Sequence, residues 1–562
     1  MSLLDKQYAY VKRYREIVDV MVKHGFGYLV DRFGLRPFRS FREKLFGPKP
    51  LKEQMLLLSE AQRLRLALEE LGPTFIKSGQ ILSTRHDLIP TEYIQELEKL
   101  QDRVRPFDFS EARNVIEKDF GGKKIEEIFQ KFNPEQIASA SIGQVYRATL
   151  SGGEEVAVKV MRPGIEELIE NDLSILMSLA KFAQKHIKES KFFNPVGFVD
   201  EFSRIIRLEI DYTHEAQNAN RFFLNFKESE NVKIPKIYWE YTTKHVICQE
   251  FLEGLKITDI EKIEAQGMDR KKICLDFSYA YLKMIFEDSF YHADPHPGNI
   301  LVSPVGKIIF LDFGMAGHID PLLRENLTNL IIAIQLNDVD VLIEALTEMG
   351  LISDMGSESP LIKLKLDELL TNYYDLSSKF INPSDFLRDL IAIFAGTGGK
   401  VPSNIMLLSK TLIIREEISR KLDPEHNFGE LTQPYVKKML TDRAKASHLF
   451  KEAEKTISDL VRLMKNFPKR VNHLLAKAEK GTLKLELEHL GLDGLVEELD
   501  IMSNRLSFSM IIASLIVGSS LIIQTRMSPS LFGVPFLGII GFLIAGFLGI
   551  GLLISIIRSG KW

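Results

Sequence analysis

The chain has 562 residues, too many for a single hydrophobic core, and its 45% hydrophobic and 26% charged residues are typical of a folded protein. A formal net charge of −4 excludes a polycation built for nucleic acid, so we expect no nucleic-acid partner. The two cysteines, Cys248 and Cys274, are too few for a disulfide framework or a cysteine-rich zinc site, and they fit a reducing compartment.

Charge is unevenly distributed along the chain. Residues 1–50 contain 11 Lys or Arg against 5 Asp or Glu, and residues 443–481 contain 10 against 4. Both segments have a helical pattern, and basic helices beside a membrane can bind anionic headgroups. We therefore expect membrane lipids, anionic ones included, as partners, although a solvated helix face would give the same pattern.

The predicted elements follow in chain order. Apolar spacing predicts helices over 51–137, and the pattern changes to strand, turn and strand over 145–160. Helices return over 162–230, short strands follow over 232–252, and the region 258–440 is mainly helical. The sequence HADPHPGNILVSPVGKIIFLDFG interrupts that last region with a predicted loop, strand, turn and strand. This order indicates an α+β fold.

The C-terminal end predicts a helical hairpin in a membrane. Residues 506–525 and 531–557 are uncharged, and a bilayer core requires about 20 apolar helical residues. A pair of buried core helices is the alternative, but soluble helices seldom contain such long apolar runs. Small residues recur at helical spacing and would allow close helix contact in lipid, although glycine is also common in membrane helices in general. The small residues are Ser514, Gly518, Gly541, Ala545 and Gly549.

The charges beside the two spans predict their orientation. Arg505, Arg558 and Lys561 flank the outer ends, and only Arg526 lies in the connecting turn. The positive-inside rule then places both ends in the cytoplasm. The N-terminus has charges through its apolar stretch and no small-residue cleavage site, so it is not a secretory signal. We expect a cytoplasmic (inner) membrane protein with its catalytic domain on the cytoplasmic face.

Four fragments have the order and spacing of the phosphate-handling motifs of protein kinases. The first is Ala138-Ser139-Ala140-Ser141-Ile142-Gly143-Gln144-Val145, which has the GxGxxGxV spacing with alanine in the first two glycine positions. The others are Val156-Ala157-Val158-Lys159, His292-Ala293-Asp294-Pro295-His296-Pro297-Gly298-Asn299 and Asp312-Phe313-Gly314. Any one of these motifs by itself can occur by chance, and His292 by itself is better explained as a core histidine. The four motifs together, in this order, indicate a kinase-like site for ATP or ADP with Mg²⁺.

Each fragment has a physical role in that chemistry. The N–H groups of a turn between strands can cover phosphates. Lys159 supplies a cation for the phosphates, while Asn299 and Asp312 supply hard oxygen ligands for Mg²⁺. Asp294 can orient an attacking hydroxyl or water, or accept its proton. The candidate nucleotide contacts are residues 138–145, Ala157, Lys159 and Glu250.

Three departures distinguish the chain from an ordinary protein kinase: the alanines of the loop, which should hold nucleotide differently, the missing activation segment, which argues against a protein kinase, and the acidic cluster described in the next paragraph. Ala138 and Ala140 stiffen the loop because alanine resists the positive φ that glycine adopts. A helical pattern also begins soon after Gly314, without an APE sequence, which leaves little room for a segment that docks a peptide. Water, a lipid or a small molecule is therefore the expected phosphoryl acceptor.

An acidic cluster lies at Glu209, Asp211 and Glu215, about 50 residues past Lys159. In a helix Asp211 and Glu215 would share one face. One glutamate of this cluster should pair with Lys159. Glu215 is favoured, Glu209 is the rival, and a solvated helix face is the alternative for the whole cluster.

An upstream segment completes the pattern: Lys77-Ser78-Gly79-Gln80. This KxGQ segment, the Ala-rich loop, the E-x-D at Glu209 and Asp211, HADPHPGN and DFG together resemble the UbiB family. These are atypical kinase-like proteins linked to ubiquinone and other isoprenoid-quinone pathways. The resemblance covers nearly the whole chain and includes the C-terminal hairpin.

The resemblance implies several expectations for the site. Lys77 and Gln80 would fold over the active site, and Glu209 and Asp211 would be acidic contacts there. The opposite charges of Lys77 and the acidic cluster predict a direct contact. The family also implies ATP with Mg²⁺, ATPase activity, and isoprenoid-quinone precursors or quinone-biosynthesis enzymes as partners.

These observations predict a two-lobed, protein-kinase-like α+β fold with a helical N-terminal extension and a C-terminal transmembrane hairpin. The expected parts are a basic helical region at 1–70, a KxGQ helical extension at 71–137, an N-lobe with a helical insertion at 138–257, a C-lobe at 258–440, a basic helical stalk at 441–504 and two transmembrane helices at 505–558. The predicted function is a membrane-anchored ATPase that supports isoprenoid-quinone synthesis. A phosphotransferase for a lipid or small alcohol and a non-catalytic nucleotide-binding scaffold are the alternatives.

Overall fold

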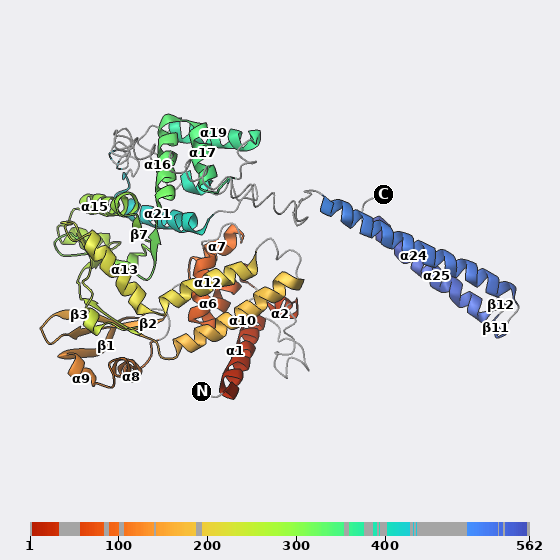
Figure 1. Ribbon diagram of the computed structural model, residues 1–562, viewed down its shortest axis with the longest axis horizontal. Coiled ribbons are helices and arrows are strands. Elements are labelled where there is room, and N and C mark those ends of the chain that lie inside the picture. Colours follow the sequence, from red (N-terminus) through yellow and green to blue (C-terminus); the bar gives the residue numbers. More distant parts are fainter. Residues whose placement is uncertain are drawn as a thin grey trace, which may run out of the picture. The chain divides into compact units, whose positions relative to one another are not determined.

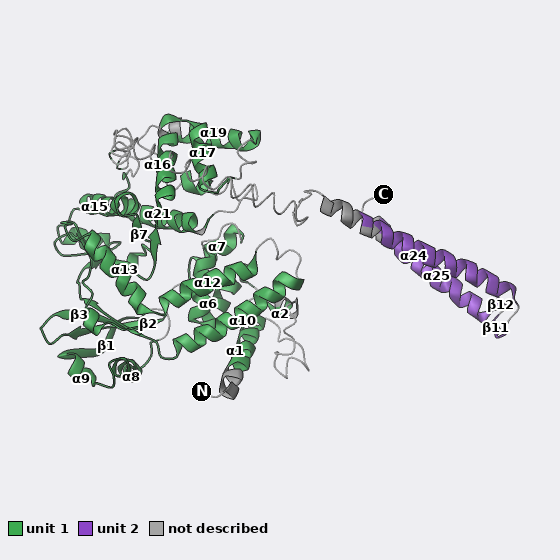
Figure 2. Cartoon of the chain, viewed as in Figure 1, with its two compact units in different colours: residues 1–448 green, residues 449–562 purple. Residues whose placement is uncertain are grey.

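The computed structural model divides the chain into two compact units, residues 1–448 and 449–562, shown in green and purple in Figure 2. The described residues are 3–32, 57–83, 89–100, 106–139, 142–186, 194–352, 359–375, 386–390, 393, 402–426, 431, 434, 492–525, 528–531 and 534–558. The basic stalk predicted at 441–504 therefore lies outside the described residues up to residue 491.

The N-lobe contains an antiparallel sheet in the order β1-β2-β3-β5. The strands are β1 (Lys131–Ser139), β2 (Gly143–Thr149), β3 (Glu155–Met161) and β5 (Val246–Glu250). Alternate residues of β3, including Val156, Val158 and Val160, are fully buried. They share one core with helices α8 (Phe109–Asp119) and α9 (Ile125–Ile128). The predicted strand–turn–strand over 145–160 is confirmed by β2 and β3.

The prediction of helix through residue 137 is wrong for its last part, because residues 131–137 lie in β1. Asn133 and Pro134 disfavour a helix here, and proline is tolerated at the edge of a sheet, where β1 lies. The ladder with β2 shifts register between Phe132 and Gln136, around that proline. Phe132 packs against Phe129 and Tyr146. These ring contacts and the backbone pairing with β2 hold β1 in place.

A helical extension precedes the N-lobe. It consists of α1 (Leu3–Lys23), α2 (Gly27–Arg32), α5 (Glu60–Leu71), α6 (Pro73–Leu82) and α7 (Thr91–Leu97). Ser59 caps α5 in a capping box with Gln62. Gly72 then adopts φ +96°, and Pro73 begins α6, so the predicted break between the two helices is confirmed.

The extension packs on two helices inserted between β3 and α13 (Tyr212–Asn225), namely α10 (Ile165–His186) and α12 (Pro195–Glu209) (Figure 1). Buried Arg13 of α1 donates from Nε to Asp172 of α10 at 2.6 Å and from Nη2 to the carbonyl oxygen of Leu71 at 2.7 Å. Burial raises the pKa of Asp172, although Arg13 opposes that shift. This buried ion pair therefore ties α1, α5 and α10 together.

The C-lobe contains a second four-stranded sheet in the order β4-β9-β8-β6. Its strands are β4 (Val232–Lys233), β9 (Ile308–Phe310), β8 (Ile300–Val302) and β6 (Leu255–Lys256), and a separate pair joins β7 (Phe290–His292) to β10 (Ala316–His318). The helices are α14 (Ile260–Ala265), α15 (Arg270–Leu282), α16 (Pro321–Leu336), α17 (Val339–Glu348), α19 (Pro360–Asp375) and α21 (Ser403–Leu422). One continuous core runs from α13 through the four-stranded sheet and strand β7 to these helices.

The second unit is a helical hairpin of α24 (Leu492–Gln524) and α25 (Phe536–Arg558), joined through the short strands β11 (Ser530–Leu531) and β12 (Val534–Pro535). Met502–Gln524 and Phe536–Ile554 are long and apolar enough to cross a membrane, and their side chains are mostly exposed. The small-residue prediction is correct in part. A Cβ on Gly541 would collide with the Ser519 side chain, whereas Gly518 and Gly549 face open space.

Candidate functional site

The centre of the site is an ion-pair group drawn from three elements of both lobes. Lys159 lies on β3, Glu215 in the first turn of α13, and Asp312 two residues after the end of β9. Lys159 Nζ lies 2.9 Å from Glu215 Oε2 and 3.2 Å from Asp312 Oδ2. The expected pairing of Lys159 with Glu215, and not with Glu209, is therefore present in the structure.

The charges of this group are unbalanced, because one ammonium serves two carboxylates. Burial raises the pKa of Glu215 to about 7, although Lys159 opposes the shift. Burial opposes ionisation of Asp312 too, but the Lys159 ammonium and the Gly314 amide outweigh it and lower that pKa to about 2. The two carboxylates outweigh burial at Lys159 and raise its pKa well above its usual value. Additional positive charge at Asp312 would therefore relieve an electrostatic cost.

Asp312 also has the chemistry and exposure of a magnesium ligand. Its side chain is 38% exposed, compared with 8% for Glu215. The described residues contain no group of three or more His, Cys, Asp or Glu side chains that could hold a metal by themselves. Mg²⁺ commonly takes one or two protein oxygens together with phosphate oxygens. Asp312 and the half-buried Asn299 fit that mode, in which the nucleotide supplies the remaining ligands.

The two candidate catalytic segments of the C-lobe, those of Asp294 and Asp312, run side by side. The Leu311 amide donates to the Asn299 carbonyl oxygen at 3.0 Å, and the Ala293 amide donates to the Met315 carbonyl oxygen at 3.1 Å. Asp294 is half-buried and follows directly after Ala293. The loop that carries Asp294 and the segment that carries Asp312 are thus held together by backbone hydrogen bonds.

His292 has a structural position, as its sequence context suggested. It is fully buried, and its Nε2 donates to the carbonyl oxygen of Asp312. Burial lowers the pKa of His292, which favours the neutral ring. Its ring packs against Phe313, which itself contacts Phe222 of α13 with ring centroids 5.3 Å apart. His292 therefore fixes the backbone of Asp312 and cannot reach a ligand.

Two residues of α13 complete the site, and the motif analysis assigned neither a role. Asn218 Nδ2 donates to the Phe313 carbonyl oxygen at 3.0 Å, which links the helix of Glu215 to the segment of Asp312. The Tyr212 ring centroid lies 5.2 Å from Lys159 Nζ, and its buried hydroxyl has no hydrogen-bond partner among the described residues. Tyr212 and Asn218 lie three residues before and three residues after Glu215, so helical spacing in the sequence could have placed both on the same face as Glu215.

The Ala-rich loop is described except for Ala140 and Ser141. Ala138 and Ser139 end β1 and face Val145 and Gln144 of β2. Gly143 is required sterically, because a Cβ would lie 2.6 Å from the Val160 carbonyl oxygen and would also collide with the Tyr212 hydroxyl. This glycine lets β2, β3 and α13 approach one another beside Lys159.

Other candidate nucleotide contacts have side chains with structural partners. Gln144 is fully buried and donates to the Phe107 carbonyl oxygen at 3.2 Å, so its side chain faces the N-lobe core. Glu250 pairs with Lys233 at 2.8 Å, which links β5 to β4. The other candidates in this region are buried Ile142 and Ala157 and half-buried Val145. For Gln144 and Glu250 the geometry thus favours a role in the fold over a side-chain contact to nucleotide.

With this geometry in place, comparison with known proteins identifies the family. Residues 99–346 match the ABC1 atypical kinase-like domain, 366–427 the UbiB helical domain and 490–558 the ABC1/UbiB kinase-like C-terminal domain. The "Probable protein kinase UbiB" of Marinobacter nauticus is 33% identical over 84% of this chain and 89% of its own length. The chain belongs to the UbiB family.

Other relatives cover similar spans. An "Uncharacterized protein in hydrogenase 1 5'region" of Clostridium pasteurianum is 34% identical over 98% of this chain and 99% of its own length. The "Probable protein kinase UbiB" of Pseudomonas fluorescens is 34% identical over 74% of this chain and 78% of its own length. The predicted family and the kinase-like α+β fold are confirmed.

A second ion pair joins the N-terminal helical extension to the helices inserted in the N-lobe, in addition to that of Arg13 and Asp172. Lys77 of α6 lies 2.6 Å from Glu209 at the end of α12, and the two side chains are 12% and 17% exposed. The expected contact between Lys77 and the acidic cluster is therefore present. Gln80 Nε2 donates instead to the Leu100 carbonyl oxygen at 3.2 Å, which holds α6 to the end of the α7 segment.

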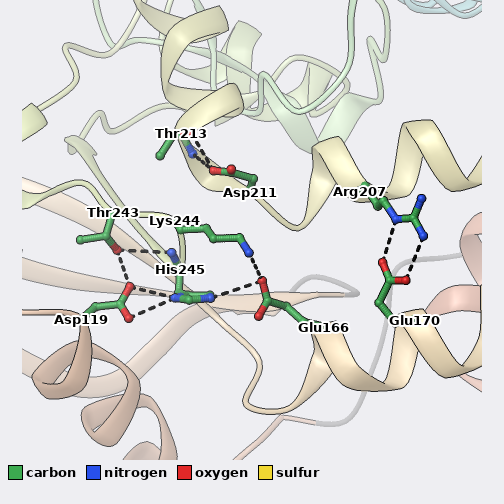
Figure 3. Close-up of polar contacts among 9 residues, drawn as sticks. All are labelled: Asp119, Glu166, Glu170, Arg207, Asp211, Thr213, Thr243, Lys244 and His245. Carbon is green, nitrogen blue, oxygen red and sulfur yellow. Dashed lines mark hydrogen bonds and ion pairs between the residues drawn. The ribbon is translucent and has the colours of Figure 1, made fainter.

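The acidic cluster is not one helical face. Glu209 ends α12, and Asp211 precedes α13 as its N-cap, accepting from the Thr213 amide at 3.0 Å. Figure 3 shows this cap. The expectation that Asp211 and Glu215 share a helical face is wrong, because Asp211 is extended and Glu215 lies inside the next helix. The two glutamates thus pair with different lysines on either side of a helix junction.

Proposed function

We propose that this UbiB-family protein binds Mg·ATP or Mg·ADP between its lobes and hydrolyses ATP. The observation that carries the proposal is the group of Lys159, Glu215 and Asp312, in which one cation from the N-lobe joins two carboxylates from different elements. Glu215 holds the Lys159 ammonium in place, and Lys159 is available for the phosphates of a nucleotide. Asp312 and Asn299 would hold Mg²⁺, which supplies charge neutralisation for the triphosphate.

In this proposal Asp294 orients the attacking group or accepts its proton. Its half-buried position beside the Asp312 segment is compatible with that role. Water is the proposed acceptor, because α16 begins at Pro321, soon after Gly314, and leaves little chain for a peptide-docking segment. The ion pair of Lys77 and Glu209 further supports the proposal, since it holds the helical extension against the N-lobe insertion.

The biological context follows from the family. We propose that ATP hydrolysis supports isoprenoid-quinone synthesis, with hydrophobic quinone precursors or the enzymes that process them as partners. The apolar hairpin of α24 and α25 would anchor the chain in the cytoplasmic membrane, with the site on the cytoplasmic face. A chain truncated before Arg505 should lose its membrane association and retain nucleotide binding.

One experiment separates the candidate activities. The full chain in lipid nanodiscs is incubated with γ-³²P-ATP, Mg²⁺ and membrane lipid extract, and the label is followed into phosphate, lipid and protein. Release of labelled free phosphate by the parent, and its loss in Asp312→Asn, would support ATP hydrolysis at this site. Labelled lipid would identify a phosphotransferase, and nucleotide binding without label transfer would indicate a scaffold.

A further inference from the structure

Helix α21 of the C-lobe buries a line of polar side chains. Thr411, Arg415 and Ser419 are each fully buried, and their spacing of four residues places them on one face of the helix. A buried helix face is usually apolar, and an arginine is almost never fully buried unless it is paired. These three residues, the polar stripe of α21, therefore need a physical explanation.

The last two residues of the polar stripe fix α21 on its neighbour α15 (Figure 1). Arg415 Nη2 donates to Glu416 at 2.5 Å, and Arg415 Nη1 donates to Ser278 Oγ of α15 at 3.2 Å. Cys274 of α15 donates from Sγ to the Ser419 carbonyl oxygen at 3.5 Å. Burial lowers the pKa of Arg415 to about 10, although Glu416 opposes that shift. Because these buried groups are satisfied in one relative position of the two helices, they fix the register of α21 on α15.

The first residue of the polar stripe reaches the loop of Asp294. Thr411 Oγ1 donates to the Ala293 carbonyl oxygen at 3.0 Å, and it also lies 2.8 Å from the Leu407 carbonyl oxygen of its own helix. In a helix the Leu407 carbonyl already accepts the amide of residue 411. Ala293 is 1% exposed, so its carbonyl depends on a donor from the protein. The Thr411 hydroxyl thus satisfies a buried carbonyl directly before Asp294.

A second hydroxyl holds the preceding carbonyl. Tyr281 of α15 is fully buried, and its hydroxyl donates to the His292 carbonyl oxygen at 3.3 Å. The helices α15 and α21 therefore hold two successive carbonyls, those of His292 and Ala293. The Ala293 carbonyl and the Asp294 amide belong to one planar peptide unit, so the contact with Thr411 sets the orientation from which Asp294 starts.

We propose that Thr411, together with Tyr281, is a positioning residue for Asp294, and that the polar stripe of α21 keeps Thr411 in register with the Asp294 loop. This rests on the proposed function, because Asp294 is the proposed base or orienting group of ATP hydrolysis. Helix α21 lies in the part of the chain that matches the UbiB helical domain, so this domain would contribute to turnover as well as to the fold.

The proposal predicts a larger effect on turnover than on nucleotide binding. The nucleotide would be held by Lys159, Asp312 and Asn299, none of which contacts the polar stripe through a recorded hydrogen bond. Asn299 is also fixed separately, because its carbonyl oxygen accepts from the Leu311 amide. Loss of the Thr411 hydroxyl should therefore misplace Asp294 and leave Mg·ATP affinity largely unchanged.

The test measures ATP hydrolysis and Mg·ATP affinity of the full chain in lipid nanodiscs. In Thr411→Val, which removes the hydroxyl and keeps the branched shape, kcat should fall about tenfold, a part of the roughly 10²–10⁴-fold contribution of a positioned acid or base, while affinity changes less than about twofold. Thr411→Ser keeps the hydroxyl and should recover most of the loss. Thr347→Val is the matched control, because Thr347 Oγ1 donates to the Ile343 carbonyl oxygen of its own helix at 2.8 Å, and it should keep the parent kcat.

Three outcomes in this assay would overturn the proposal. The first is a parent kcat in Thr411→Val, and the second is a kcat in Thr411→Ser as low as in Thr411→Val. The third is an equal loss of kcat and affinity in Thr411→Val, since only a structural role would remain. If Thr411→Val does not fold, Tyr281→Phe tests the same loop through the His292 carbonyl. It should lower kcat about threefold, and a parent kcat in that variant would then overturn the proposal.

Amide hydrogen exchange provides a readout that needs no nucleotide. The amides of Ala293 and His296, which donate to the Met315 and Asp294 carbonyl oxygens, should exchange faster in Thr411→Val than in the parent, Thr411→Ser or Thr347→Val. Equal exchange in Thr411→Val and the parent would overturn the positioning role. A parent that does not hydrolyse ATP would contradict the proposed function, while exchange would still decide whether Thr411 holds the Asp294 loop.

Discussion

Replacing Lys77 by alanine should loosen the helical extension from the acidic end of α12. Lys77 Nζ lies 2.6 Å from Glu209 Oε1, and the two side chains are 12% and 17% exposed. Exposed ion pairs contribute about 0–1 kcal/mol, whereas breaking a buried pair costs about 3–5 kcal/mol. A pair this shielded should lie between those limits, so we expect a coupling free energy of about 2 kcal/mol.

The assay is a double-mutant cycle with Lys77→Ala, Glu209→Ala and the double variant. Free energies of unfolding are measured by urea titration of the full chain in detergent. The exposed pair of Lys23 and Glu70, with side chains 54% and 38% exposed, is the matched control and should couple by less than about 1 kcal/mol. A Lys77–Glu209 coupling no larger than the control would refute the inference that this contact holds the extension.

The same variants test whether the extension matters for nucleotide chemistry. Lys77→Ala removes the ion pair between Lys77 and Glu209, while Glu215 keeps its ion pair with Lys159. The proposed phosphate site therefore remains assembled. We expect a changed nucleotide affinity and autophosphorylation that the parent lacks. Unchanged affinity together with unchanged phosphoryl transfer would remove the functional meaning of the contact.

Three further perturbations follow from the structure. Gly143→Ala should destabilise the chain by about 2 kcal/mol in urea unfolding, because the new Cβ meets the rigid carbonyl of Val160. Asp172→Asn should cost about 3 kcal/mol in the same assay, because it removes the buried carboxylate that pairs with the Arg13 guanidinium. Glu215→Gln should change the pH dependence of stability. The pKa of Glu215 is raised from 4.5 to about 7 in the folded chain, so between these pH values the unfolded chain ionises this carboxyl more readily than the folded chain does. The free energy of unfolding of the parent should therefore fall by about 3 kcal/mol, relative to the variant, between pH 4.5 and pH 7.

Each of these predictions has a nearby control. Gly152→Ala meets only the flexible Glu154 side chain and should cost less than Gly143→Ala. Glu16→Gln removes an exposed partner of Arg13 and should cost under about 1 kcal/mol. Equal losses within either matched pair would contradict the packing and burial arguments. Parallel pH profiles for parent and Glu215→Gln would contradict the raised pKa.

The sequence was sufficient to predict those features that depend on the spacing of chemically active residues within a motif. The order of the four motifs was sufficient to predict the kinase-like fold. The resemblance to the UbiB family singled out Lys77, and its opposite charge then matched it with the acidic cluster. The choice of Glu215 as the partner of Lys159 followed from its place in the cluster, and the structure brings the two within 2.9 Å. The ion pairs Lys77–Glu209 and Lys159–Glu215 join residues that are far apart in the chain, but each residue belongs to a motif that can be recognised in the sequence.

The remaining features depend on tertiary contacts that local patterns do not encode. Strand β1 has few buried side chains, so only its ladder with β2 distinguishes it from the preceding helices. Asp211 caps α13 because the helix ends at Glu209 and a new helix begins at Tyr212. The sequence pattern predicted helix throughout this region and did not indicate that boundary. Gln144 lies within a phosphate-loop motif, but the alternation of β2 turns its side chain into the core.

The most direct test of the nucleotide site is the Mg²⁺ dependence of ATP binding in Asp312→Asn, measured by equilibrium dialysis on the full chain in nanodiscs. Asp259→Asn is the matched control, because the Asp259 side chain is 36% exposed and pairs with Lys262. If Asp312 is the anionic ligand of Mg²⁺, the parent and the control should bind Mg·ATP alike, and Asp312→Asn should bind it at least about tenfold more weakly, a loss of about 1.4 kcal/mol. Equal Mg·ATP affinity in parent and Asp312→Asn would contradict the assignment of the site.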